Sequence, residues 1–279
     1  MPGIPTHVDG RPIFGPPRPP HHNYILHVRL CPEQIVDPPV SRVLSCPGDA
    51  TFDDLHKALQ IAFGWATTHC YDFKVRNPAY AAPDEETEML AMIQRLRRQN
   101  GVDPEGVDHD HDALSRSPPK SLLRLIQKQD PRKWPLGIGV DSMFANMEKH
   151  PLTPERPAKD VKLNEVFEDA KYRGRAMEYE YDFGDHWVHD ISVEGRANAT
   201  RAFECLDGSG HAVAEDAGGP HKWQELKQAY RAPEPSQEQR ETMQWFEREA
   251  SNRDVRGLAG GRERVWDRYV VNRRLMEEM

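Results

Sequence analysis

The stretch from Met177 to Glu194 constrains the fold of this chain more than any other part of its sequence. Two runs of alternating apolar and polar residues flank the polar turn Phe183-Gly184-Asp185-His186, a pattern typical of a β-hairpin. Because side chains alternate across a strand, Tyr179 and Tyr181 are predicted to share one face of the first strand. One face of the second strand is predicted to carry Trp187, His189, Ile191 and Val193.

Within this hairpin, His189 is predicted to lie on the core side, with Asp182 and Asp185 at the turn beside it. A histidine in that position is either a hydrogen-bonded core residue or a functional residue. We favour the first interpretation, in which His189 is satisfied within the core and the two aspartates accept hydrogen bonds from turn amides. A metal-ligating or catalytic role for the same residues stays open as the alternative.

The N-terminal part of the chain predicts strands at residues 24–30, 40–46 and 69–75, since each shows short apolar or alternating runs. A helix is expected after the second strand. Thr51 and Asp54 have the spacing of a capping box, Phe52 starts an apolar stripe with helical spacing, and Gly64 is a natural C-terminal stop.

The remaining segments predict the domain organisation. Residues 1–22 are interpreted as a disordered proline-rich tail and residues 23–279 as a single domain. Within that domain, residues 83–160 are interpreted as a charged insertion, with helices expected at 85–98 and 121–129. A compact pattern resumes at 161–167 and a strand is expected at 201–206. The last helices are expected at 221–230, 236–249 and 262–276, so that residues 236–279 are mainly helical.

Strands that come first and helices that come last favour the α+β class. We expect an antiparallel or mixed sheet, with the capped helix after the second strand and the C-terminal helices packed on it.

Composition excludes several functional classes. The chain has 279 residues and a formal net charge of −8, which argues against a non-specific nucleic-acid binder, although a local basic patch stays open. The four cysteines are scattered without a C-x-x-C pair, which argues against a zinc ribbon and a disulfide scaffold. No secretory signal and no apolar run of about 20 residues is visible. We therefore expect an intracellular protein, cytoplasmic or nuclear, without a membrane partner.

Three separated blocks carry a family resemblance. The first is T-F-D-D-L-H-K-A-L-Q-I-A-F-G-W, followed by His69 and Phe73. The second is Y-E-Y-D-F-G-D-H-W-V-H-D-I-S-V-E, and the third combines C-L-D-G at Cys205 with E-D-A-G-G at Glu215. Together they resemble the plasmid pRiA4b Orf-three-like family, whose members are also described as transposon passenger proteins of the TnpR type. The resemblance covers residues 24–80 and 160–230.

The resemblance implies a compact α+β domain of undefined activity, found near mobile elements in bacteria and also in fungi. The long insertion suggests a fungal member. The family name does not imply a resolvase, because an activated serine in an arginine-rich setting is not found in the sequence. This chain departs from the family pattern at Ser41, at Tyr71 and at Ala212-Val213-Ala214.

Chemistry-bearing side chains in these blocks define a candidate groove beside the hairpin. Its members are His56, Trp65, His69, Asp182, Asp185, Trp187, His189, Glu215 and Asp216. The first hypothesis is a non-catalytic binding or accessory module of mobile-element-associated type, with a protein or nucleic-acid partner and no cofactor. The alternative is a metal-dependent hydrolase built on Asp182, Asp185, His189 and Glu215 or Asp216, since imidazole and carboxylate groups suit zinc, manganese or iron. The run Asp108-His109-Asp110-His111-Asp112 is interpreted as a solvated acidic loop of the insertion.

Overall fold

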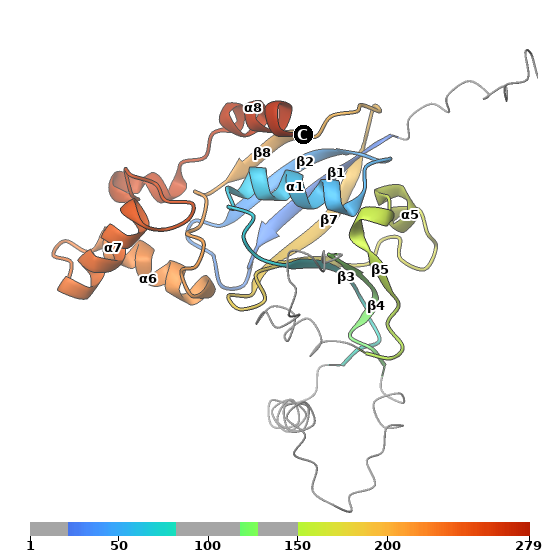
Figure 1. Cartoon of the computed structure of the whole chain (residues 1–279), viewed down its shortest axis with the longest axis horizontal. Coiled ribbons are helices and arrows are strands. Elements are labelled where there is room, and N and C mark those ends of the chain that lie inside the picture. The colour runs from blue at the N-terminus through green and yellow to red at the C-terminus, as the bar shows by residue number, and fades with distance from the viewer. Residues whose placement is uncertain (1–21, 82–117, 128–149) are drawn as a thin grey trace, which may run out of the picture.

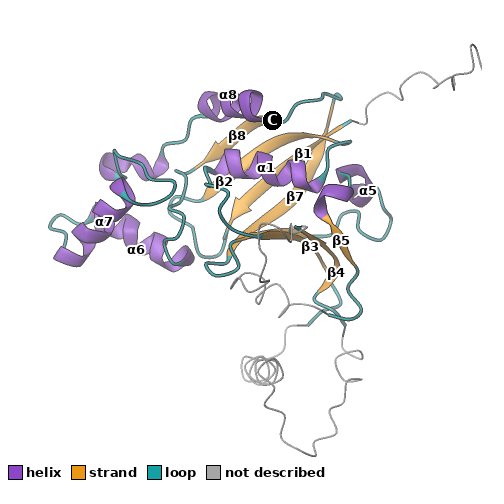
Figure 2. Cartoon of the chain, viewed as in Figure 1, coloured by secondary structure: helices purple, strands orange, loops and turns teal. Residues whose placement is uncertain are grey.

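The computed structural model describes residues 22–81, 118–127 and 150–279. These residues form an eight-stranded sheet with the order β5-β4-β3-β6-β7-β1-β2-β8. Helix α1 lies across one face of the sheet, and helices α6 and α7 extend from one end of it (Figure 1). Figure 2 shows the same arrangement coloured by secondary structure, with the strands in one layer and the helices around it. The expected α+β class with a mixed sheet is confirmed.

The centre of the sheet joins the first strand of the described chain to a strand far along the sequence. Strand β1 (Asn23–Leu30) pairs antiparallel with β2 (Val40–Pro47) and, on its other side, with β7 (Trp187–Ala197). The predicted alternation of β1 is confirmed, since one of its faces is fully buried. That face carries Tyr24, Leu26, Val28 and Leu30.

Helix α1 (Phe52–Phe63) begins and ends as its sequence predicts. The side chain of Thr51 accepts a hydrogen bond from the Asp54 amide, and the Asp54 carboxylate accepts one from the Thr51 amide, which together form a capping box. Gly64 ends the helix in the left-handed conformation, with φ 78°. The helix buries one apolar face on the sheet, where the ring of Phe52 lies edge-on to that of Phe73 at 5.1 Å.

One of the strands on the other side of β7 differs from its prediction, which was a helix. Strand β3 (Tyr71–Arg76) lies between β6 (Met177–Tyr181) and β4 (Ser121–Ile126), so the helix expected at 121–129 is wrong. The segment S-L-L-R-L-I is buried at four of its six positions, including Arg124, whose guanidinium pairs with Asp72 at 2.6 Å. A strand buried on both faces does not alternate, and a short apolar run has no periodicity that separates strand from helix.

Strand β5 (Glu155–Pro157) adds a parallel edge to β4 and leads into a 3-10 turn, η1 (Ala158–Asp160). Both β4 and β5 lie within the interval 83–160 that the sequence suggested as an insertion. The helix expected at 85–98, the run at 108–112 and the tail at 1–21 lie outside the described residues. The tail and the insertion therefore stay predictions.

After β5 the chain forms the short helix α5 (Leu163–Phe167), the hairpin β6–β7 and strand β8 (Glu204–Ser209). Strand β8 begins three residues later than expected. Helices α6 (Gly219–Arg231) and α7 (Gln237–Arg248) confirm the two expected helices.

The last expected helix, at 262–276, is wrong in its first half. The chain forms a 3-10 turn, η2 (Ala259–Arg264), and α8 (Arg268–Glu278) starts only after Asp267. The Asp267 carboxylate accepts hydrogen bonds from the amides of Tyr269 and Val270, so this residue caps a new helix start. Between the turn and the helix, Trp266 lies over the Arg42 guanidinium at 5.4 Å. Among the described residues, no helix is both long enough and apolar enough to cross a membrane.

Candidate functional site

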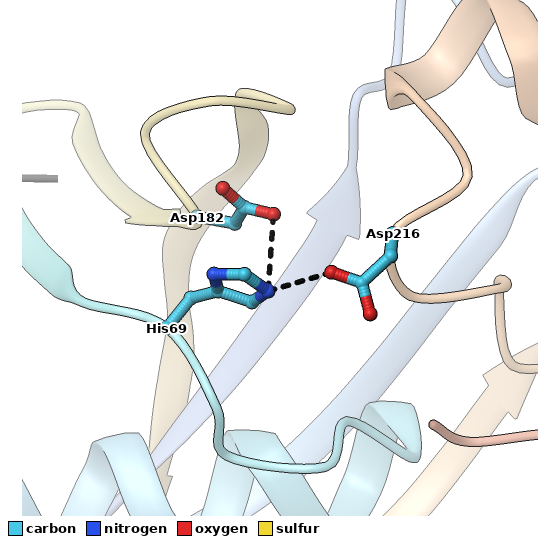
Figure 3. Close-up of side chains that lie close together, drawn as sticks. All are labelled: His69, Asp182 and Asp216. Atoms are coloured by element: carbon cyan, nitrogen blue, oxygen red, sulfur yellow. Dashed lines mark hydrogen bonds and ion pairs between the residues drawn. The ribbon is translucent and has the colours of Figure 1, made fainter. Parts of the chain in front are cut away.

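Three loops meet beyond the C-terminal end of β6. They are the loop at 64–70 after α1, the hairpin turn at 182–186 and the loop at 210–218 before α6. Each contributes one side chain, and Figure 3 shows these three side chains pointing toward one another: His69, Asp182 and Asp216.

The imidazole of His69 is the centre of this cluster. Its Nε2 lies 2.8 Å from Asp216 Oδ1 and 3.5 Å from Asp182 Oδ2. One ligand atom from each of the three residues lies within 4.8 Å of the others. The Asp182 side chain is 6% exposed and the Asp216 side chain 48%, so the cluster has a buried side and a solvent side.

Local backbone geometry aims the Asp182 carboxylate at the cluster. Asp182 adopts φ 58° and its Oδ1 accepts hydrogen bonds from the amides of Gly184 and Asp185, which leaves Oδ2 directed at His69. The expectation that Asp182 bonds turn amides is confirmed, and the same residue also belongs to the cluster. Its neighbour Asp185 accepts from the Gly218 amide at 2.9 Å, so it ties the hairpin turn to the third loop rather than to its own turn.

The third loop is held by its own contacts. Asp216 adopts φ 62°, and its Oδ2 accepts a hydrogen bond from the Ser251 hydroxyl at 3.0 Å. Gly219 lies at φ 85°, where an added Cβ would lie 2.8 Å from the carbonyl oxygen of Asp185. The close approach of the two loops therefore requires glycine at this position.

Glu215 is a fully buried connector and not a member of the cluster. Its Oε1 accepts from the Tyr181 hydroxyl at 2.5 Å and from the Thr68 hydroxyl at 2.7 Å, and its Oε2 accepts from the Ala66 amide at 2.5 Å. The Glu215 amide in turn donates to the side chain of Asn252 at 2.8 Å. The hydrogen bonds that the Glu215 carboxylate accepts join the third loop to the first loop and to the end of β6. Glu215 therefore positions the loops that carry the cluster.

His189 is a satisfied core histidine, as the favoured interpretation expected. It is fully buried, its Nδ1 donates to the carbonyl oxygen of Trp187 at 2.9 Å, and its Nε2 accepts from the Trp65 indole at 3.4 Å. Both ring nitrogens are therefore used by the protein. Burial lowers the pKa of His189 to about 3, and the carbonyl contacts offset this only in part.

His56 is a second buried imidazole in the core below the three loops. Its Nδ1 accepts from the Tyr179 hydroxyl at 2.8 Å, and its ring stacks on Tyr71 at 3.6 Å. Burial lowers the pKa of His56 to about 3. The aromatic members Trp65 and Trp187 are also buried, and their ring centres lie 5.4 Å apart within the core.

The charges of the cluster act on one another. Burial alone would lower the pKa of His69, but the hydrogen bond to Asp216 and the charges of Asp182, Asp216 and Glu215 raise it overall. Burial raises the pKa of the Asp182 carboxyl, against the opposing effect of His69 and the turn amides. One imidazole and two carboxylates form a donor set that suits zinc, manganese or iron.

Sequence reasoning grouped nine residues, and the structure brings three of them into one cluster. Asp185 and Glu215 hold the loops, while the other four belong to the core. Ser251 and Asn252 support the third loop and were missed, because nothing in the short polar stretch after α7 marks it as a neighbour of the hairpin.

The fold and the site together define an α+β protein in which three sequence blocks meet at a histidine–aspartate cluster. The chain belongs to the plasmid pRiA4b ORF-3-like protein family, which matches residues 22–257.

One curated protein and one solved structure are similar to this chain. The chain is 26% identical over 212 residues to the uncharacterized protein y4hQ of Sinorhizobium fredii, with 75% of each chain covered. It is also similar to the crystal structure of a protein of unknown function, MM3350, from Methanosarcina mazei Go1. That similarity has 20% identity and a TM-score of 0.49, and it covers 81% of this chain and 89% of the other.

Proposed function

We propose that the chain is a binding module whose ligand site is the His69–Asp182–Asp216 cluster, and that the cluster takes a divalent transition-metal ion. The observation that carries this proposal is the convergence of three donor atoms within 4.8 Å, each from a different loop. The pattern also fits the sequence, since each loop belongs to one of the blocks by which the family resemblance was recognised.

The support around the cluster favours a preorganised site. Glu215, in the third loop, binds the first loop and the end of β6, and Asp185 binds the third loop to the hairpin turn. Groups behind the ligands fix their orientation, as hydrogen-bonded neighbours do in known metal sites. An ion that bound here would therefore find its ligands already placed.

A metal-dependent hydrolase is the second candidate. It is favoured by the exposure of Asp216, because a three-ligand site open on one side leaves room for a bound water. The mobile-element association is an implication of the family resemblance, and the metal proposal does not depend on it.

The test is metal binding by the full-length protein. Isothermal titration calorimetry with Zn²⁺ and with Mn²⁺, after treatment with a chelator, is expected to show about one ion per chain. We expect His69→Ala and Asp216→Asn each to weaken binding at least tenfold, because each removes one ligand. His221→Ala is the matched control, since this histidine is 86% exposed on α6 and lies outside the cluster.

Melting temperatures of all variants separate loss of a ligand from loss of the fold. A wild-type protein that binds neither ion at millimolar concentration would overturn the proposal, as would a His69→Ala variant that binds as tightly as the wild type. For the second candidate, the metal-loaded protein is assayed on a model phosphodiester and a model ester. Turnover that disappears in His69→Ala would support a hydrolase.

A further inference from the structure

A cavity of about 480 Å³ lies at the opposite end of β6 from the metal-site candidate. It is lined by residues of β1, of β7 and of the loop at 168–176, which joins α5 to β6. Its volume is within the range of pockets that hold small molecules.

The loop that forms the wall of the cavity is itself folded. The Tyr172 amide donates to the Asp169 carbonyl at 3.0 Å, and the Arg175 amide donates to the Tyr172 carbonyl at 3.0 Å. Gly174 occupies the third position of the second turn with φ 72°, and no atom lies within 4 Å of an added Cβ there. The pocket wall is therefore a hydrogen-bonded turn that already has its shape.

Arginines dominate the polar lining of the cavity. Two of them are paired with acids: Arg196 donates to both oxygens of Glu168, at 2.8 and 3.0 Å, and Arg29 lies 3.5 Å from Asp190. Arg173 and Arg175, on either side of Gly174, have no carboxylate partner among the residues that the structure describes. In a chain of net charge −8, this is a local basic site with two uncompensated guanidinium groups.

Two guanidinium groups suit a doubly charged anion. Arginine binds phosphate oxygens in pairs of parallel hydrogen bonds, and a phosphate monoester carries close to two negative charges at neutral pH. A carboxylate, with one charge, would satisfy only one of the two groups.

Part of the remaining lining is apolar. The wall and floor include Phe167, Met177, Ile191 and Val193. Val193 is 45% exposed although it continues the buried face of Trp187 and Ile191, because at this end of β7 that face borders the cavity. A bound molecule would therefore present an apolar surface to the floor and a charge to the loop.

We propose that this pocket binds a small organic phosphate with a flat apolar group, of which a mononucleotide is the simplest example. The phosphate lies against Arg173 and Arg175, and the ring lies on the apolar floor at Met177 and Val193. The site is separate from the metal-site candidate, so neither proposal depends on the other.

Calorimetric titration of the metal-free, full-length protein with adenosine monophosphate tests the proposal. We expect saturable binding, with adenosine and inorganic phosphate each at least tenfold weaker, because each lacks one half of the ligand. The variant Arg173→Gln/Arg175→Gln is expected to lose at least tenfold in affinity. Val193→Glu is expected to lose a similar factor, because it places a negative charge on the pocket floor.

The matched control is Arg248→Gln/Arg253→Gln, which removes the same charge from two exposed arginines around the end of α7. All four substituted arginines are exposed, so the variants are expected to keep the wild-type melting temperature. Absence of saturable binding of adenosine monophosphate at millimolar concentration would overturn the proposal. Equal binding by the two double-arginine variants, or inorganic phosphate that binds as tightly as the nucleotide, would overturn it as well.

Discussion

The two core histidines illustrate how burial fixes the state of a single residue. His56 and His189 are each kept neutral by burial, which disfavours the charged imidazole, and each has a pKa near 3 instead of 6.5. Between these values the unfolded chain binds a proton on each histidine and the folded chain does not. The free energy of unfolding must therefore fall as the pH drops from 6.5 toward 3.

We expect acidification from pH 7 to pH 5 to cost about 2 kcal/mol of stability for each of these histidines. Urea denaturation at several pH values measures this. In His56→Gln and His189→Gln the dependence on pH should become shallower, whatever the variants lose in absolute stability. His221→Gln is the control, since this histidine lies outside the core, with a side chain that is 86% exposed on α6. An unchanged slope in both core variants would contradict the assignment.

For single residues, the sequence predicted their positions in the fold better than their roles. Alternation placed His189 on the core side correctly, and the turn position of Asp182 was visible in the string Y-D-F-G-D. The sequence did not indicate that Glu215 holds the loops together while Asp216 belongs to the cluster. Adjacent acids differ here because one side chain points at Tyr181 and the other at His69, and that direction is set by loops distant in sequence.

Elements were predictable where local chemistry defines their ends. The capping box and Gly64 fix α1, and Ser236 with Gln239 fixes the start of α7. Prediction failed at β4, whose identity comes from being buried between two neighbouring strands. It also failed before α8, where tertiary packing of Trp266 on Arg42 interrupts the helical pattern.

The start of α6 offers a test of how closely the loops must approach. Gly219→Ala and Gly260→Ala both place a side chain at positive φ, near 85° and 68°, but only at Gly219 would the new Cβ meet another backbone atom. We expect Gly260→Ala to cost about 1 kcal/mol and Gly219→Ala at least about 1 kcal/mol more. Thermal and urea denaturation give the difference.

The same pair also reports on the metal-site candidate. Because the carbonyl of Asp185 must move to accommodate the methyl group that Gly219→Ala adds, metal affinity should fall in that variant and stay unchanged in Gly260→Ala. Equal losses of stability in the two variants would show that the loop contact is unimportant.

For the whole molecule, the C-terminal helix protects an open edge of the sheet. The side chain of Asn272 accepts from the Cys205 amide at 2.7 Å and donates to the Cys205 carbonyl at 2.9 Å, as a neighbouring strand would. Strand β8 is the last of the sheet order, and α8 lies beyond the residues that match the family. Unprotected edge strands tend to pair with other chains.

A chain that ends at Asp267 is therefore expected to self-associate and to melt at a lower temperature, as measured by light scattering and calorimetry. The point variant Asn272→Ala should cost about 1–2 kcal/mol, because it leaves two backbone groups of β8 without partners. Arg273→Ala, an exposed neighbour on the same helix, should change stability by less than about 0.5 kcal/mol. A truncated chain that stays monomeric would contradict this role of α8.

The pairing of β1 with β7 has a consequence for synthesis of the protein. Leu30 lies opposite His189 in the finished sheet, about 160 residues later in the chain. At translation rates of roughly 5–20 residues per second, the N-terminal hairpin leaves the ribosome on the order of 10 to 30 seconds before its partner strand exists. Its apolar face and open edge are exposed to solvent during that interval, so the nascent chain is a natural client for chaperones that bind extended apolar segments.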